Sequence, residues 1–417
     1  MTSTEQRRGD SPPADTTARE HFIPLRPAEL VQKLADDPAL TIPERQQFRQ
    51  FCQLVEATIH HEYWTRLQAL KAAYAPFDPD SDAYGNAATE GVSCTAAGGP
   101  PSAQALFEQF DELLMRANYR RLPREELERA VEEPNQTGLH LHLNLDIFER
   151  LEIYVRGNAT TTKTCRTWRS LWQPRSVSMP VHRRLALIFR LQQVTPATDR
   201  LDTRAVVLKL FKDIPHQDVE TLLPGACIRI GLIEQAKIVL PTLSGVGLTI
   251  IKLLKGAAAV AFVSLYGLIA FLALISGAIG YGVRSFFGYL RTREKHQLSL
   301  TRHLYFQNLD NNSGVIYHLL NEAEEQEFRE MVLAYWLLWR GRQSGATTEQ
   351  LDTAAETWLR ERCSLEVDFE ISDALAKLQR LGLAQSTLTR SVSKGVGSRW
   401  QAAPIESALE TLDRAWD

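Results

Sequence analysis

A run of 28 residues without a charged side chain, 256–283, constrains this chain more than any other feature of its sequence. As a helix, the run would be about 42 Å long, whereas the hydrocarbon core of a bilayer is about 30 Å thick. A soluble core helix of this length normally has a polar face, and this run has none. The run therefore predicts a transmembrane helix, with a buried core helix or an oligomer interface as the alternative.

A second apolar run, 238–251, lies just before the first and is short for an independent span. Only Lys252 and Lys255 separate the two runs, so they are able to form two limbs of a hairpin with the lysines near its turn. Basic residues also flank the pair on its outer sides, and the positive-inside rule therefore does not choose between the arrangements. We predict a membrane segment over 236–290, as one span or as a hairpin.

Charge and cysteine content exclude several classes of protein. The chain has 47 basic and 50 acidic residues and a net charge of −3, which argues against a protein that coats nucleic acid. Its five cysteines are an odd number without a C-x-x-C pair, so they indicate a reducing compartment rather than a disulfide framework or a zinc site. Residues 1–20 contain no apolar signal region and predict a disordered tail on the cytoplasmic side.

Before the membrane segment, the pattern predicts a helical region and then a small sheet. In region 21–136, apolar residues recur at helical spacing from Ile42 until Pro76, and a loop rich in Ala, Gly and Pro follows at 77–102. Region 137–235 contains short apolar strand patterns, LHLNLDIF, LEIYVRG, RRLALIFRLQ and RAVVLKLFKDI. It is predicted to be a small α+β domain with an antiparallel sheet.

Region 291–417 predicts a helical and winged-helix-like domain. A helix is expected over 315–340, with five glutamates in its first half. These glutamates lack the Glu-x-x-His step of a di-metal bundle, so we interpret them as a solvated acidic face on which Glu325 pairs with Arg329.

The end of this region has its own pattern. Thr347 and Gln350 fit a capping box, and two helices, a hairpin and a last helix follow. Its acidic residues outnumber its basic ones, which favours contact with protein over DNA. The predicted fold class is therefore α+β: a helical N-terminal region, a small antiparallel sheet, a central transmembrane segment and a C-terminal winged-helix-like module.

The chain has no motif that specifies a reaction. It lacks a P-loop, a G-x-S-x-G elbow, a kinase set and a zinc-protease H-E-x-x-H step, so we predict no catalytic, cofactor-binding or metal-binding residues and no cofactor. An unrecognised enzyme would have to use other polar groups, of which we consider Lys212, Asp213, His216, Asp310 and Asn311. A charged pair at a strand end, such as Lys212 with Asp213, is more often part of a turn.

Several blocks of the sequence, read in order, resemble the uncharacterised membrane-protein family that includes transmembrane protein 143. The blocks are HFIPLR, ANYRRL, YVRG, LKLFKDIPHQDVETLLPG, LPTLSG, YFQNLDNNSGVIYHLLNEAEEQE and DFEISDALAKLQRLGL. The resemblance covers nearly the whole chain from His21, and it implies attachment to a membrane through the central apolar region. The expected location is an inner or plasma membrane in a bacterium, or a mitochondrial membrane in a eukaryote. The resemblance implies no reaction, ligand or catalytic residue.

Two hypotheses for the function follow. The first is a membrane-anchored interaction or scaffold protein of unknown biochemical activity that presents cytoplasmic domains at the bilayer. Its expected partners are the lipid bilayer and either another protein or further copies of itself in a homo-oligomer, and no nucleic acid is expected. The alternative is an unrecognised enzyme that acts on a lipid or a membrane-bound substrate.

Overall fold

The computed structural model describes eleven stretches of the chain and three single positions. The stretches are 19–81, 102–123, 125–127, 140–142, 145–166, 174–192, 204–224, 227–229, 306–341, 345–391 and 395–414, and the single positions are 276, 280 and 287. The helices are α1 (Pro27–Ala35), α2 (Ile42–Tyr74), η1 (Ala75–Phe77), α4 (Ala103–Arg116), η2 (Leu145–Ile147), η4 (His216–Leu222), α9 (Ser313–Arg340), α10 (Thr348–Cys363), α11 (Ile371–Arg380) and α12 (Ile405–Arg414). The strands are β1 (Arg120–Arg121), β2 (His140–His142), β3 (Phe148–Arg166), β4 (Pro174–Leu191), β5 (Val206–Pro215), β6 (Cys227–Arg229), β7 (Asn308–Asn311), β8 (Ala346–Thr347), β9 (Ala384–Ser391) and β10 (Gly395–Ala402).

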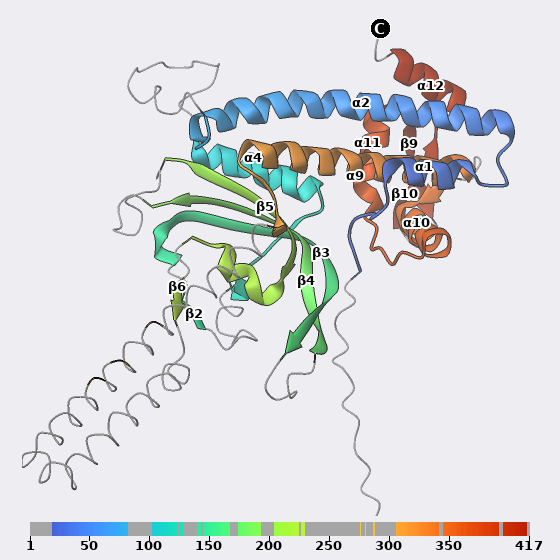
Figure 1. Ribbon diagram of the computed structural model, residues 1–417. Coiled ribbons are helices and arrows are strands. Elements are labelled where there is room, and N and C mark those ends of the chain that lie inside the picture. Colours follow the sequence, from blue (N-terminus) through green and yellow to red (C-terminus); the bar gives the residue numbers. More distant parts are fainter. Residues whose placement is uncertain are drawn as a thin grey trace, which may run out of the picture.

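Helices cover one face of an antiparallel sheet with strand order β1-β3-β4-β5-β7 (Figure 1). Side chains alternate between the two faces because successive residues of a strand point in opposite directions. One set packs into the large core shared with the helices: Tyr154, Ala186, Ile188, Val206, Leu208 and Leu210. The other set packs on the opposite face with residues of η2 and η4: Ile153, Val155, Leu185, Leu187 and Phe189. The predicted small antiparallel sheet is confirmed.

The long helix α2 begins and ends where the sequence predicts. Thr41 and Glu44 form a capping box, in which the Thr41 amide donates to Glu44 Oε2 over 2.8 Å. At the other end, Tyr74 Oη donates to the Val206 carbonyl over 2.9 Å, so the last turn is tied to the sheet. The helix lies along α9 and also contacts α12 and α4 (Figure 1).

The hairpin of β3 and β4 is longer than the strand patterns predict. Its register runs without interruption from Arg150 paired with Arg190 to Arg166 paired with Pro174. The outer part of β3, NATTTKT, has no apolar alternation, so no buried face marks it in the sequence. Its threonines are β-branched and suit an extended backbone once a partner strand is in place.

Helix α9 lies at the centre of the large core, between α2, α4, α11 and the sheet (Figure 1). Its second half, predicted from the run MVLAYWLLW, is buried almost throughout. Aromatic contacts fix α2 against it, since the rings of Phe51 and Tyr335 stack with centroids 4.0 Å apart and those of Phe48 and Trp339 with centroids 5.8 Å apart.

A polar cluster fixes the start of α9. Asn312, which precedes the helix, has a φ of 47° and donates through its side-chain amide to Asp80 over 2.6 Å. Its side-chain oxygen accepts from the Leu208 amide of β5 over 3.2 Å. The carboxylate of Asp310 lies where a Cβ on Gly314 would be, at the positive end of the helix dipole. The polar residues and the glycine of the block QNLDNNSG therefore form the start of this helix.

The C-terminal elements follow the order helix, helix, hairpin. Strand β8 joins the hairpin of β9 and β10 in a three-stranded sheet with the order β8-β10-β9. Thr347 and Gln350 form the predicted capping box of α10, and Gly382 follows α11 with a φ of 72°. With α9 in front, this is the element order of a winged-helix-like unit. The helices of this unit share one core with α1, α2 and α4.

The prediction of a central transmembrane segment, as one span or as a hairpin, is corrected. Among the described residues, no helix combines the length and the apolar composition that a bilayer crossing requires. The apolar second half of α9 is buried against α2, α4 and α11. The runs 238–251 and 256–283 lie outside the described residues, apart from Ser276 and Gly280.

This correction extends to the predicted membrane localisation with a cytoplasmic N-terminus. The predicted tail lies outside the described residues except for Arg19 and Glu20, and so does most of the predicted loop 77–102. The α+β class itself is retained, with helices packed on an antiparallel sheet.

We predict that Gly314→Ala lowers the free energy of unfolding by about 2 kcal/mol, because the added Cβ would displace the Asp310 carboxylate from the start of α9. The measurement is urea denaturation followed by circular dichroism. The control is Gly341→Ala at the other end of the same helix, where the nearest atoms are backbone oxygens at 3.4 Å. Equal stabilities of the two variants would contradict the assigned role of Gly314.

Candidate functional site

The polar groups considered from the sequence do not converge. Lys212 and Asp213 lie at the end of β5, where Asp213 has a φ of 53°, is exposed and accepts a hydrogen bond at its carbonyl from Gln307 Nε2 over 2.9 Å. Asp310 lies at the start of α9, where its carboxylate accepts from the Asn311 amide and lies 3.2 Å from His318 Nδ1. These contacts belong to a turn and to a helix start.

His216 has a different environment, because it meets a histidine that the sequence analysis did not consider. Its ring stacks on that of His182, with centroids 3.9 Å apart and planes 19° from parallel. His182 lies on β4 and is 5% exposed, and burial followed by the nearby His216 lowers its pKa to about 3. Burial and the charge of Arg120 also lower the pKa of His216.

A buried carboxyl lies one turn further along η4. Burial, together with the charge of Asp218, raises the pKa of Glu220 to about 7. Perturbed groups of opposite type so close in the chain are typical of acid–base sites. A metal site is not favoured, because nitrogen lone pairs lie in the ring plane and two nearly parallel stacked rings do not direct them at one ion. Among the described residues, no three His, Cys, Asp or Glu side chains are arranged to hold a metal.

Helix α9 carries the largest group of buried charges in the described part of the chain, and here the sequence-based interpretation is wrong. Three of its five glutamates do not form a solvated face: the side chains of Glu322 and Glu327 are 12% and 2% exposed, and Glu330 is buried. Glu325 lies nearer the surface and forms the predicted pair with Arg329, at 3.1 Å.

Glu322 connects α9 to the sheet. One carboxylate oxygen accepts from Tyr119 Oη over 2.6 Å, and the other lies 3.2 Å from both Arg156 Nη2 and Arg184 Nε. Burial and the charge of Glu322 raise the pKa of Tyr119 well above its ordinary value, so this phenol stays protonated. The guanidinium of Arg156 also lies 5.0 Å from the centre of the Tyr119 ring.

Glu327 connects α9 to α2 and α11. Its Oε2 accepts from Tyr63 Oη over 2.8 Å and lies 3.0 Å from Lys377 Nζ. Burial and the charge of Glu327 raise the pKa of Tyr63, which therefore remains a hydrogen-bond donor. A buried carboxylate needs such partners, because desolvation without them costs several kcal/mol.

Glu330 and Arg329 connect α9 to the N-terminal segment and the end of α4. Glu330 Oε1 accepts from Gln326 Nε2 over 2.8 Å and from Asn118 Nδ2 over 3.2 Å, and burial raises its pKa. Arg329 Nη1 donates to the Leu25 carbonyl over 2.8 Å. All three connections along α9 therefore have a structural role, and their residues are enclosed in the fold.

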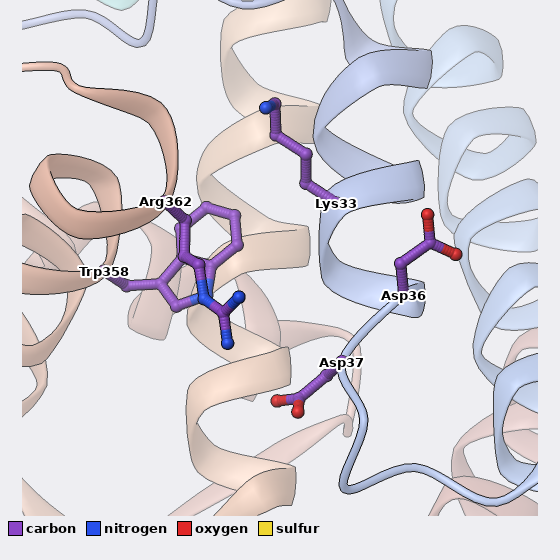
Figure 2. A pocket seen from close by; sticks show the side chains of 5 residues that line it. All are labelled: Lys33, Asp36, Asp37, Trp358 and Arg362. Atoms are coloured by element: carbon purple, nitrogen blue, oxygen red, sulfur yellow. The ribbon is translucent and has the colours of Figure 1, made fainter.

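A pocket of about 230 Å³ lies between the end of α1 and α10. It is lined by Lys33, Asp36, Asp37, Trp358 and Arg362 (Figure 2). In Figure 2 the Asp37 carboxylate and the Arg362 guanidinium point into the space between the two helices. The sequence does not predict these residues as a site, because α1 and α10 are more than 300 residues apart in the chain.

We predict that Lys377→Met lowers the free energy of unfolding by roughly 3 kcal/mol, because it leaves the Glu327 carboxylate buried beside Tyr63 alone. Adding Glu327→Gln should recover part of this loss, since the unpaired charge is then gone. The control is Arg360→Ala, which removes an exposed pair of the same length, Arg360 with Glu366 at 3.0 Å, and should change the stability far less than Lys377→Met because water screens this pair. Chemical denaturation of the three variants and the unsubstituted protein measures all of these differences.

The histidine pair predicts a loss of stability in acid. Above pH 6.5, His182 is neutral in both the folded and the unfolded chain. Between pH 6.5 and about pH 3, the unfolded chain binds a proton at His182 and the folded chain does not. The free energy of unfolding should therefore fall by about 1.4 kcal/mol per pH unit below 6.5 through this group.

Glu220 has the opposite effect: between about pH 7 and pH 4.5 the folded chain binds its proton more tightly, so the free energy of unfolding rises as the pH falls. The two proteins compared must therefore both contain Glu220. His182→Gln should show a shallower decline between pH 7 and pH 5 than the unsubstituted chain in denaturation curves. The same slope in both proteins would show that His182 is protonated in the folded state.

Comparison with known families gives one match. Residues 171–314 match a family described as Protein of unknown function (DUF3754), which spans β4, β5, η4 and β7 and so includes the histidine pair and the start of α9. No solved structure matches the chain. The match does not connect the chain to transmembrane protein 143 or to membrane proteins. Over residues 171–314, the chain is therefore similar to a family whose biochemical function is unknown.

Proposed function

We propose that this protein is an interaction or scaffold protein that contacts a protein partner or a second copy of itself. The helical layer and the winged-helix-like unit share one hydrophobic core, so they present their outer surfaces as parts of one body. Large apolar side chains remain on that surface, including Trp64 of α2, 54% exposed, and Met115 of α4, 58% exposed. Tryptophan and methionine are enriched at protein interfaces relative to other surfaces.

The observation that carries the proposal is that both basic side chains of α11 form ion pairs within the protein. In a helix-turn-helix unit the second helix is the one that reads DNA, and α11 holds that position after α10. Its two basic side chains are already paired within the protein, Lys377 with Glu327 at 3.0 Å and Arg380 with Glu62 at 2.9 Å. A helix in this state offers little positive charge to a phosphate backbone, and this supports a protein partner over nucleic acid.

An enzyme is the second candidate, and one observation favours it. His182, His216 and Glu220 have pKa values displaced from their ordinary values. A catalytic site also needs a concave space in which a substrate meets these groups. The described pocket lies elsewhere, between α1 and α10, and we therefore rank this candidate second.

The proposal predicts a discrete cross-linked product. A photoreactive amino acid in place of Trp64 should give one product, with a partner protein or with a second copy, in the native extract. The matched control is the same substitution at Glu349, an exposed position on α10. Light scattering separates the two products, because only the second copy doubles the mass of the pure protein. Equal labelling at both positions, or a monomer with no product, would contradict the proposal.

A parallel titration with duplex DNA tests whether nucleic acid is the partner. We expect a dissociation constant weaker than about 10 μM at physiological salt, because the basic side chains of α11 are paired. Tighter binding that weakens steeply with salt would show that these pairs open and that nucleic acid is the partner.

A further inference from the structure

We infer that the pocket between α1 and α10 anchors the carboxylate of an acidic side chain on a polypeptide partner. This inference rests on the proposed function, because it names the chemistry by which such a partner is held.

The first argument is the positive charge available in the pocket. Arg362 is exposed on α10 and has no hydrogen-bond or ion-pair partner among the described residues. Lys33 has only a loose partner, since its Nζ lies 3.8 Å from Glu29 Oε1 and both side chains are largely exposed. Guanidinium groups bind carboxylates in a bidentate manner, which makes Arg362 the natural contact for a carboxylate.

The second argument is that both aspartates of the pocket have partners outside it. Asp37 is 6% exposed, lies 3.1 Å from Arg340 Nε and accepts from the Ala39 amide over 3.0 Å. Asp36 lies 3.8 Å from Arg49 Nη2. Arg340 offsets the charge of Asp37, whereas the contact of Asp36 with Arg49 is as long as that of Lys33 with Glu29. Asp36 and Lys33 therefore balance each other, and the charge of Arg362 gives the pocket its preference for an anion.

The third argument is the aromatic wall. Trp358 is 8% exposed and its ring centroid lies 5.7 Å from that of Trp336, so the wall is held in place by the core. Arg340 lies over the Trp336 ring at 5.0 Å, which links this wall to the Asp37 pair. A rigid tryptophan beside an unpaired arginine is the composition of an interface hot spot.

The size of the pocket favours a single side chain of a peptide over a cofactor. Its volume of about 230 Å³ is below the roughly 300–1,000 Å³ of pockets that enclose small-molecule ligands. The methylene groups of one glutamate fit against Trp358 while its carboxylate reaches Arg362, and the rest of the partner then lies on the surface.

The experiment is a fluorescence-anisotropy titration of the full chain with a labelled hexaglutamate peptide whose C-terminus is amidated, and with amidated hexaglutamine as the comparison without carboxylates. We expect saturable binding of hexaglutamate only. Arg362→Glu should weaken it at least about tenfold, as expected for loss of a hot-spot arginine. Because Arg362 has no described partner, this variant should keep the melting temperature of the unsubstituted protein.

The matched control is Arg414→Glu, the same charge reversal at an exposed position of α12, which should leave the affinity within about twofold. Equal weakening by both variants would indicate diffuse surface charge and overturn the inference, as would no binding of hexaglutamate or full binding by Arg362→Glu. If the cross-linked product at position 64 forms while the unsubstituted protein does not bind hexaglutamate, the proposed function stands and only the pocket assignment is rejected.

Discussion

The burial of charged side chains along α9 is the constraint on which the rest of this structure depends. A carboxylate taken out of water is tolerated only where donors replace its hydration, and the buried glutamates of α9 have such donors on different elements. Glu322 draws its donors from β1, β3 and β4 or their flanks, and Glu327 draws them from α2 and α11. The helix therefore determines where each neighbouring element lies.

The same constraint holds the N-terminal segment in place. The Ile23 amide donates to Gln326 Oε1 over 3.3 Å, and the Leu25 carbonyl accepts from Arg329. Glu20 forms a parallel bridge with Val367 and its carboxylate accepts from the Asn158 amide. The six residues from Glu20 to Leu25 thus join the central helix, the sheet and the C-terminal unit through polar contacts as well as apolar packing.

The internal use of charge also shapes the functional proposals. Lys377 and Arg380 form ion pairs with α9 and α2, so a helix in the usual position for reading DNA uses its basic side chains within the protein. Within the described pocket, the charge of Arg362 beside the wall of Trp358 remains available. The histidine pair is different again, because His182 is buried, His216 is half-buried and both have lowered pKa values, so the pair affects stability in acid.

Local signals in the sequence determined the helix starts at Thr41 and Thr347, the cores of the paired strands and the C-terminal hairpin, because caps and periodicity act within a few residues. Composition also suggested a membrane span and a solvated acidic face, and both interpretations assumed an environment from residue type alone. Only the tertiary structure decided which glutamates are buried, that His182 meets His216, and that α1 and α10 form a pocket. In each case the deciding partner lies far away in the chain, and the free energy of burying a charge depends on that partner rather than on the neighbours in sequence.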